Sequence, residues 1–97
     1  MAVFKIETPA LPDFRITQLA FKQRFTQTER IAIRSAAAAN PVVDDFLDLM
    51  NTAIFVDLAR QDTVSGVAAM EQLGLLDAGR ADEILTAPIQ EIERPKV

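Results

Sequence analysis

The sequence predicts a mainly α fold, a small bundle of four to five short helices with an extended N-terminal arm and at most a minor two-stranded β element. Two observations predict it. Apolar residues recur every three or four positions through much of the chain, as on the buried face of a helix. Prolines, glycines and capping residues divide these stretches into short segments. We expect an arm over residues 1–13, a helical domain over residues 14–87 and an extended or disordered tail over residues 88–97.

The N-terminal arm is predicted to be extended and to pack against another surface. Residues 2–7 alternate as a short strand does, and Pro9 and Pro12 then prevent a helix. An arm this apolar is expected to dock on its own domain or on a neighbouring subunit. The predicted partner-binding residues are Val3, Phe4, Ile6, Leu11 and Phe14, together with Phe21 and Phe25 of the first helix.

The first helix is predicted between about Thr17, which can cap it, and Phe25. Phe21 and Phe25 lie four residues apart and therefore share one face of this helix. The charged residues Lys22 and Arg24 are expected to face solvent.

A second and a third helix are predicted on either side of residues 40–41. Thr26 and Glu29 have the spacing of a capping box, which starts the second helix. Pro41 ends it, because the residue before a proline avoids helical dihedral angles. Asn40 and Pro41 also favour the start of the third helix. An apolar stripe marks the buried side of that helix: Val43, Phe46, Leu47 and Met50.

The last two helices are predicted on either side of a glycine-containing turn. Asp62 and Thr63 are expected to start the fourth helix, in which Gly66 would let another helix approach closely. Gly74 is expected to end it as a C-cap glycine. Asp77 is expected to start the fifth helix, which extends to about residue 85. The charged residues of that helix are expected to face solvent: Arg80, Asp82 and Glu83.

One short pair of strands is predicted. Residues 53–58 are β-branched and aromatic, which favours a short strand or an extended connector. The alternation in residues 3–7 makes that segment the expected partner.

The charges of the 97-residue chain divide into two halves. Residues 1–40 hold six Lys and Arg against three Asp and Glu, a net charge of +3. Residues 41–97 hold four against eleven, a net charge of −7. Either the two halves fold onto each other, or copies or partners stack basic end to acidic end.

The composition argues against several kinds of chemistry. The absence of cysteine excludes a disulfide framework and a thiolate metal site, and the absence of histidine removes the commonest general base and metal ligand. No apolar run is long enough for a signal peptide or a membrane span. We therefore predict a protein that is not an enzyme, has no cofactor, binds no membrane and begins in the cytoplasm.

Two charged patterns and one helix pair each have a functional and a structural interpretation. Asp44, Asp45 and Asp48 could hold Mg²⁺ or Ca²⁺, but a solvated helix start explains them better. Arg30 and Arg34 share a helical face and could bind nucleic acid, but the sequence pI of about 4.6 argues against this. The final helix pair is similar in outline to a DNA-binding helix-turn-helix. The residues at the expected small, apolar and phosphate-facing positions do not fit: Met70, Arg80, Asp82 and Glu83.

A longer pattern resembles a known group of proteins. Residues Asp57–Leu85 read DL-x-R-x-DT-x-x-GV-x-x-M-x-x-LGLL-x-x-GR-x-x-EIL, and Phe21–Ile33 read F-x-x-RFT-x-x-E-x-x-AI. With these segments, residues 14–90 resemble short proteins from the tail and tail-fibre region of temperate bacteriophages and prophages. The resemblance brings no catalytic residues.

The resemblance implies a structural or adaptor protein of the virion baseplate or tail fibre, made in the host cytoplasm. Its expected partners are other phage tail or tail-fibre proteins or further copies of the chain, and neither nucleic acid nor membrane. Two alternatives are a tail-fibre assembly chaperone that is absent from the finished particle and an acidic inhibitor or regulator of a host protein.

Overall fold

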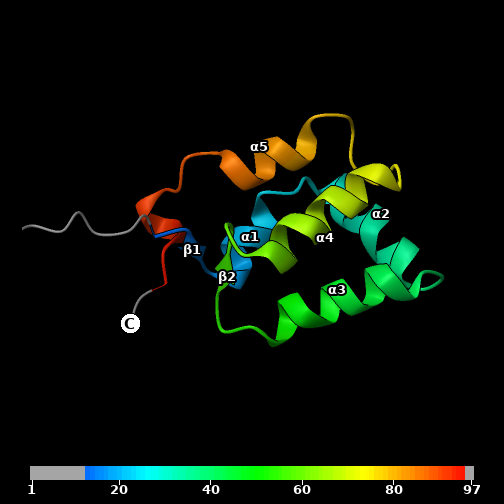
Figure 1. Cartoon of the computed structure of the whole chain (residues 1–97), viewed down its shortest axis with the longest axis horizontal. Coiled ribbons are helices and arrows are strands. Elements are labelled where there is room, and N and C mark those ends of the chain that lie inside the picture. The colour runs from blue at the N-terminus through cyan, green and yellow to red at the C-terminus, as the bar shows by residue number, and fades with distance from the viewer. Residues whose placement is uncertain (1–12, 96–97) are drawn as a thin grey trace, which may run out of the picture.

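The computed structural model describes residues 13–95 and confirms a mainly helical fold with a small antiparallel sheet. In Figure 1, α3, α4 and α5 lie roughly one above the other, and the sheet lies at the same end of the molecule as the red turn at residues 91–93. The described elements are β1 (Arg15–Ile16), α1 (Gln18–Gln23), α2 (Gln27–Ala37), α3 (Pro41–Thr52), β2 (Val56–Asp57), α4 (Gln61–Gln72), α5 (Arg80–Thr86) and the 3₁₀ turn η1 (Glu91–Glu93).

The predicted starts of the first three helices are confirmed. The Thr17 hydroxyl accepts a hydrogen bond of 3.0 Å from the Ala20 N–H at the start of α1. Thr26 and Glu29 form a complete capping box at the start of α2. The Asn40 side chain accepts a hydrogen bond from the first turn of α3, which begins at Pro41. Local sequence therefore determines where these helices begin.

The glycines of α4 act as the sequence predicts. A Cβ atom on Gly66 would overlap the Phe46 ring, so α3 and α4 can pack at this distance only because Gly66 has no side chain. Gly74 has a φ of 80°. Its N–H donates to the Glu71 carbonyl, and the next N–H, of Leu75, donates to the Met70 carbonyl, each over 3.0 Å. These are the two hydrogen bonds of a Schellman C-cap.

The predicted starts of α4 and α5 are wrong. Helix α4 begins at Gln61, and Thr63 is a buried residue of its first turn, with 1% of its surface exposed. Helix α5 begins at Arg80 after Gly79, whose φ of 89° is left-handed, because residues 77–80 form a separate turn. The carboxylate of Glu71 accepts from the Ala81 N–H over 2.9 Å, so α4 supplies the cap of α5.

The sheet uses one of the two predicted strands. Strand β2 lies inside the predicted segment 53–58, but it pairs with β1, with Ile16 opposite Val56. Both side chains are almost fully buried, and pairing brings them into the core together. The predicted partner strand, residues 3–7, lies outside the described residues.

The core receives side chains from all five helices and both strands. Phe21 and Phe25 pack edge to face, with ring centroids 5.2 Å apart. The buried apolar residues are Ile16, Ala20, Phe21, Phe25, Ile33, Val43, Phe46, Met50, Val56, Leu58, Val67, Met70, Leu76, Ala81 and Ile84.

The described part of the C-terminal tail is docked on the domain. The sequence predicts an extended or disordered segment from residue 88, whereas residues 88–95 contain η1 and contact the start of the domain. The Thr17 N–H donates to the Glu93 carbonyl over 2.8 Å, and Arg94 donates to the Asp13 carbonyl over 2.8 Å. These long-range contacts depend on partners that the local sequence does not reveal.

We expect Gly66→Ala to lower the free energy of unfolding by about 2–3 kcal/mol, because the added methyl group displaces Phe46. The higher helix propensity of alanine, worth about 1 kcal/mol, offsets only part of this. Urea unfolding followed by circular dichroism measures the change. Gly74→Ala is the control, since nothing lies within 4 Å of its Cβ position and only backbone strain opposes it. If Gly66→Ala were neutral, the close contact between α3 and α4 would not limit stability.

Candidate protein-binding groove between α2 and α3

A groove of about 940 Å³ lies between α2 and α3, beside α1. It follows the whole of α3, because residues from Pro41 to Asn51 line it. The apolar residues at its floor are Phe21, Phe25, Ile33, Phe46, Met50 and Met70. The groove is therefore an open depression whose floor is the outer surface of the core.

The two sides of the groove carry opposite charges. Arg30 and Arg34 of α2 form one side, which we name the basic rim. Asp44, Asp45 and Asp48 of α3 form the other, which we name the acidic rim. All five residues are exposed, and none of them forms an ion pair with another residue among 13–95. Both rims are available to charges from outside the domain.

The basic rim is held in place at one of its two residues. The Arg30 guanidinium donates to the carbonyls of Phe25, over 2.6 Å, and Lys22, over 3.2 Å. These carbonyls lie where α1 ends, and that of Lys22 also accepts from the Phe25 N–H over 3.2 Å. Arg34 makes no side-chain hydrogen bond within the described chain. Arg30 is thus fixed, and Arg34 can adapt.

Ile31 supplies exposed apolar surface to the groove. It lines the groove between the two arginines, and 59% of its surface is exposed.

At the end of α3, Asn51 connects to α1, since its side chain bonds Lys22 and its carbonyl accepts from Gln18 over 3.2 Å. These contacts bridge the groove at the end nearest the sheet.

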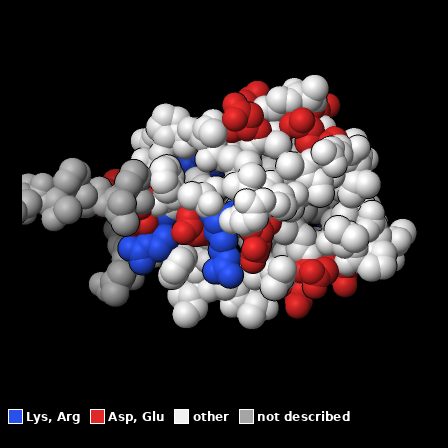
Figure 2. Space-filling model, viewed as in Figure 1, with Lys and Arg blue, Asp and Glu red and all other residues white. Residues whose placement is uncertain are grey.

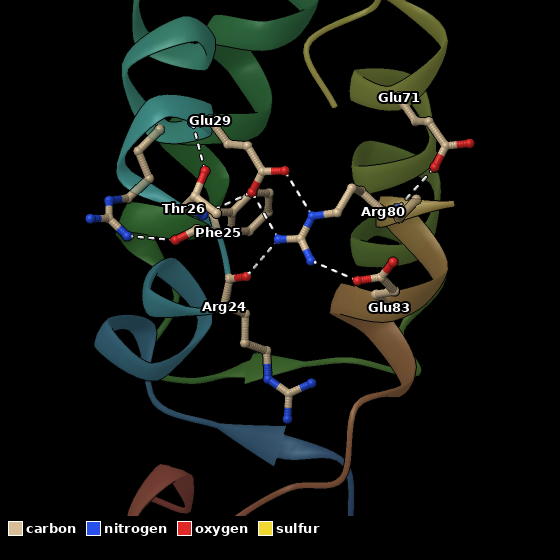
Figure 3. A network of polar contacts seen from close by, with 9 residues as sticks. Arg24, Phe25, Thr26, Glu29, Glu71, Arg80 and Glu83 are labelled. Atoms are coloured by element: carbon tan, nitrogen blue, oxygen red, sulfur yellow. Dashed lines mark hydrogen bonds and ion pairs between the residues drawn. The ribbon is translucent and has the colours of Figure 1, made fainter. Parts of the chain in front are cut away.

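Behind the groove, Arg80 joins α5 to the connection between α1 and α2 (Figure 3). Its guanidinium binds both carboxylate oxygens of Glu29 over 2.8 Å, the Arg24 carbonyl over 3.0 Å and Glu83 over 3.0 Å. Glu29 also accepts from the Thr26 N–H in the capping box. The side chain of Arg80 is 22% exposed, so the prediction that it faces solvent is wrong.

Arg24 is also a structural residue. Its side chain is 7% exposed, contrary to the prediction that it faces solvent. It makes a two-pronged contact with Glu93, at 2.9 and 3.1 Å, and donates to the carbonyls of Ile84 and Ala87. The ion pairs Arg24–Glu93 and Arg80–Glu29 each join residues 1–40 to residues 41–97. The two halves of the chain therefore fold onto each other.

These contacts lower the pKa of two carboxyl groups. The hydrogen bonds from Arg80 lower the pKa of Glu29 and outweigh its partial burial. Burial of Glu93 acts to raise its pKa, but the hydrogen bonds from Arg24 and from the Gln90 backbone outweigh it and lower the pKa. Both carboxylates therefore carry their charge in the folded state below the pH at which a free glutamate loses it.

The predicted partner-binding residues fall into three groups. Phe14 is 41% exposed and lies at the start of β1. Phe21 and Phe25 are 3% and 5% exposed, so they belong to the core and reach the surface only as the groove floor. Whether they contact a partner there stays a prediction. Four of the predicted residues lie outside the described part of the chain: Val3, Phe4, Ile6 and Leu11.

The sequence contains both rims but does not show that they face each other. The spacing of Arg30 and Arg34 predicts a shared face, and the aspartates are a visible cluster. The turn at residues 38–40 places the two sets on opposite sides of one groove. Asn40 and Pro41 mark a short connection between two helices. Since helices joined in this way are usually antiparallel neighbours, that signal could have predicted that the two rims face each other.

The remaining chemistry of residues 13–95 is limited. No group of three or more Asp or Glu side chains in this range is placed to hold a metal ion. None of the helices in this range is both long enough and apolar enough to cross a bilayer. On the face drawn in Figure 2, acidic side chains gather at the upper edge and at the lower right, and others lie among the basic side chains at the lower left. On this face, the basic side chains thus have acidic neighbours.

No protein-family model, curated protein or solved structure matches this chain.

We expect Arg80→Met to lower the free energy of unfolding by about 2–3 kcal/mol, because Glu29 and the Arg24 carbonyl would lose their partner in a largely buried place. Arg60→Met is the control, since the Arg60–Asp62 pair is exposed and should be worth less than about 0.5 kcal/mol. Adding Glu29→Gln to each variant completes a double-mutant cycle. Additive effects of the two changes would contradict the coupling.

We expect the domain to lose stability as the pH falls below the ordinary glutamate pKa of 4.5. Because folding lowers the pKa values of both carboxyl groups, the unfolded state binds more protons. Their stabilising effect is therefore complete above pH 4.5 and is lost as the pH falls through the pKa values of the folded state. Urea unfolding at a series of pH values measures this. The double variant Glu29→Gln, Glu93→Gln should show a flatter pH dependence, and an unchanged slope would contradict the assignment.

Proposed function

We propose that this chain is a non-enzymatic structural or adaptor protein that binds neighbouring proteins, in the baseplate or tail-fibre region of a phage tail. The observation that carries the binding part is the groove between α2 and α3, with its apolar floor and two charged rims that form no ion pair with residues 13–95. The phage tail rests on the sequence resemblance of residues 14–90. The proposed partners are other tail or tail-fibre proteins.

The groove favours a protein partner over a nucleic acid or a small substrate. Phosphate groups would meet the acidic rim, which repels them. The two rims of the groove carry arginines and aspartates on opposite sides, and no member of one rim is paired with the other. A peptide segment can present apolar, acidic and basic side chains together, so it can satisfy the floor and both rims.

The N-terminal arm is the second proposed contact. Asp13, at the base of the arm, is held by two arginines, since its carboxylate binds Arg15 over 2.9 Å and its carbonyl accepts from Arg94. Phe14 follows it and is exposed. An anchored base with apolar residues on either side is suited to holding a neighbouring subunit. Further copies of this chain are among its possible neighbours.

We expect the domain to stay folded after deletion of residues 1–12, because the deletion spares Asp13 and its contacts. We expect assembly into particles to be abolished, because the proposed contact with the neighbouring protein is removed. Thermal unfolding of the purified variant should show an unchanged midpoint, and virions grown with it should lack the protein. The double variant Phe4→Asp, Ile6→Asp is a matched control of full length and should fail in the same way. Normal incorporation of both variants would contradict a role for the arm.

Mass spectrometry of purified virions, with copy number, tests the proposed function itself. We expect the chain in intact particles at a fixed ratio to a baseplate or fibre protein. Its absence, combined with capture of a fibre protein from infected cells, would favour the assembly chaperone. Its absence combined with capture of a host enzyme would favour the acidic inhibitor.

A further inference from the structure

We infer that the groove receives an amphipathic α-helix of a partner protein, with acidic residues on the side next to α2 and basic residues on the side next to α3, and that the two rims fix the direction of that helix. This rests on the proposed function as a protein-binding module. To that function the inference adds the helical form of the partner segment, its charge pattern and the direction in which it binds.

The dimensions of the groove suit a helix. Helix α3 has 12 residues and is therefore about 18 Å long. Three apolar side chains at positions i, i+3 or i+4, and i+7 of a partner helix span about 10 Å, so they fit along it. Ile31 offers the largest exposed apolar surface in the groove, and a partner helix would cover it.

The charges of the rims specify the sides of the partner helix. Arg34 and the three aspartates of the acidic rim are exposed and have no ionic partner among the described residues. A helix with acidic residues on one side of its apolar stripe and basic residues on the other would pair with both rims at once. Such exposed pairs add modest affinity, but they set register and exclude wrong partners.

The same arrangement selects a direction. Turning the partner helix end for end, with its apolar stripe still in the groove, exchanges its two sides. Acidic residues would then face the acidic rim, and basic residues would face Arg30 and Arg34. Only one of the two directions is therefore free of repulsion.

Two other occupants fit less well. The charged side chains of residues 1–12 are Lys5 and Glu7, one for each rim, whereas the acidic rim alone holds three aspartates. Pro9 and Pro12 prevent a helix there. A second copy facing the first would place one hollow over another and leave both floors uncovered. A helix of a different protein is the occupant that fills the groove and satisfies both rims.

The test uses the full chain and a synthetic helical peptide of about 14 residues, with leucines along one stripe, glutamates on one side of it and lysines on the other. Two control peptides carry glutamates, or lysines, on both sides. Fluorescence anisotropy should show the mixed peptide binding about tenfold more tightly than either control. Ile31→Glu should abolish binding, whereas Leu19→Glu, at a residue 65% exposed outside the groove, should not.

A spin label on the peptide N-terminus tests direction. It should broaden the amide signal of only one of Ala38 and Asn51, which line opposite ends of the groove. Arg34→Glu alone should weaken binding. Arg34→Glu with Asp44→Lys and Asp48→Lys leaves the α2 side with no net charge and the α3 side with a net charge of about +1, and should therefore favour the opposite direction. Equal binding of all three peptides, no binding of any, or broadening at both ends would overturn the inference.

Further measurements identify a different occupant. If deletion of residues 1–12 shifts the amide signals of the groove, the arm occupies it and the inference is wrong. If Ile31→Glu converts a dimer to a monomer in sedimentation, a second copy occupies it and the inference is also wrong. Particles that contain the chain and incorporate Ile31→Glu normally would overturn the inference and leave the proposed function standing. If the chain binds the peptide in one direction but is absent from virions and from tail-protein complexes, the inference stands and the proposed function is wrong.

Discussion

The contact between Arg80 and Glu29 is the constraint on which the rest of the domain depends. It joins the start of α5 to the start of α2 through two hydrogen bonds of 2.8 Å. The same guanidinium binds the carbonyl of Arg24, which would otherwise lack a partner where α1 ends. Three helices thus meet at one planar group, whose fork of donors fixes their relative orientation in a way that a lysine could not.

The groove is a consequence of that arrangement. Because the connection between α1 and α2 is held by Arg80 from one side and by Arg30 from the other, Phe21 and Phe25 remain in the core and close the groove floor. On the opposite side, α3 is held against α4 at Gly66. The two rims are therefore carried by helices that pack against each other and that are each held by a further contact, α2 through Glu29 and Arg30 and α3 through Gly66. A surface positioned in this way can bind a partner with little reorganisation.

Sequence reasoning succeeded where the signal is local. The capping box at Thr26, the Asn40 and Pro41 start and the Schellman glycine at Gly74 each depend on a few neighbouring residues, and the structure confirms them. It failed where a side chain finds its partner far along the chain. Arg24 bonds a residue 69 positions away, so it was expected to face solvent, as was Arg80. The groove was missed for the same reason, because its two rims become neighbours only when the hairpin of α2 and α3 forms.

The contact between Arg94 and Asp13 joins residues 81 positions apart, and it has a consequence for the order of events during synthesis. A ribosome releases residue 13 long before residue 94. Throughout that interval β1 and α1 lack the Glu93 and Arg94 contacts that hold them in the finished domain. The base of the arm is therefore fixed only after translation has passed α5. Until then Asp13 and Thr17 lack the partners that hold them, so this edge of the domain is completed last, after all five helices have been made.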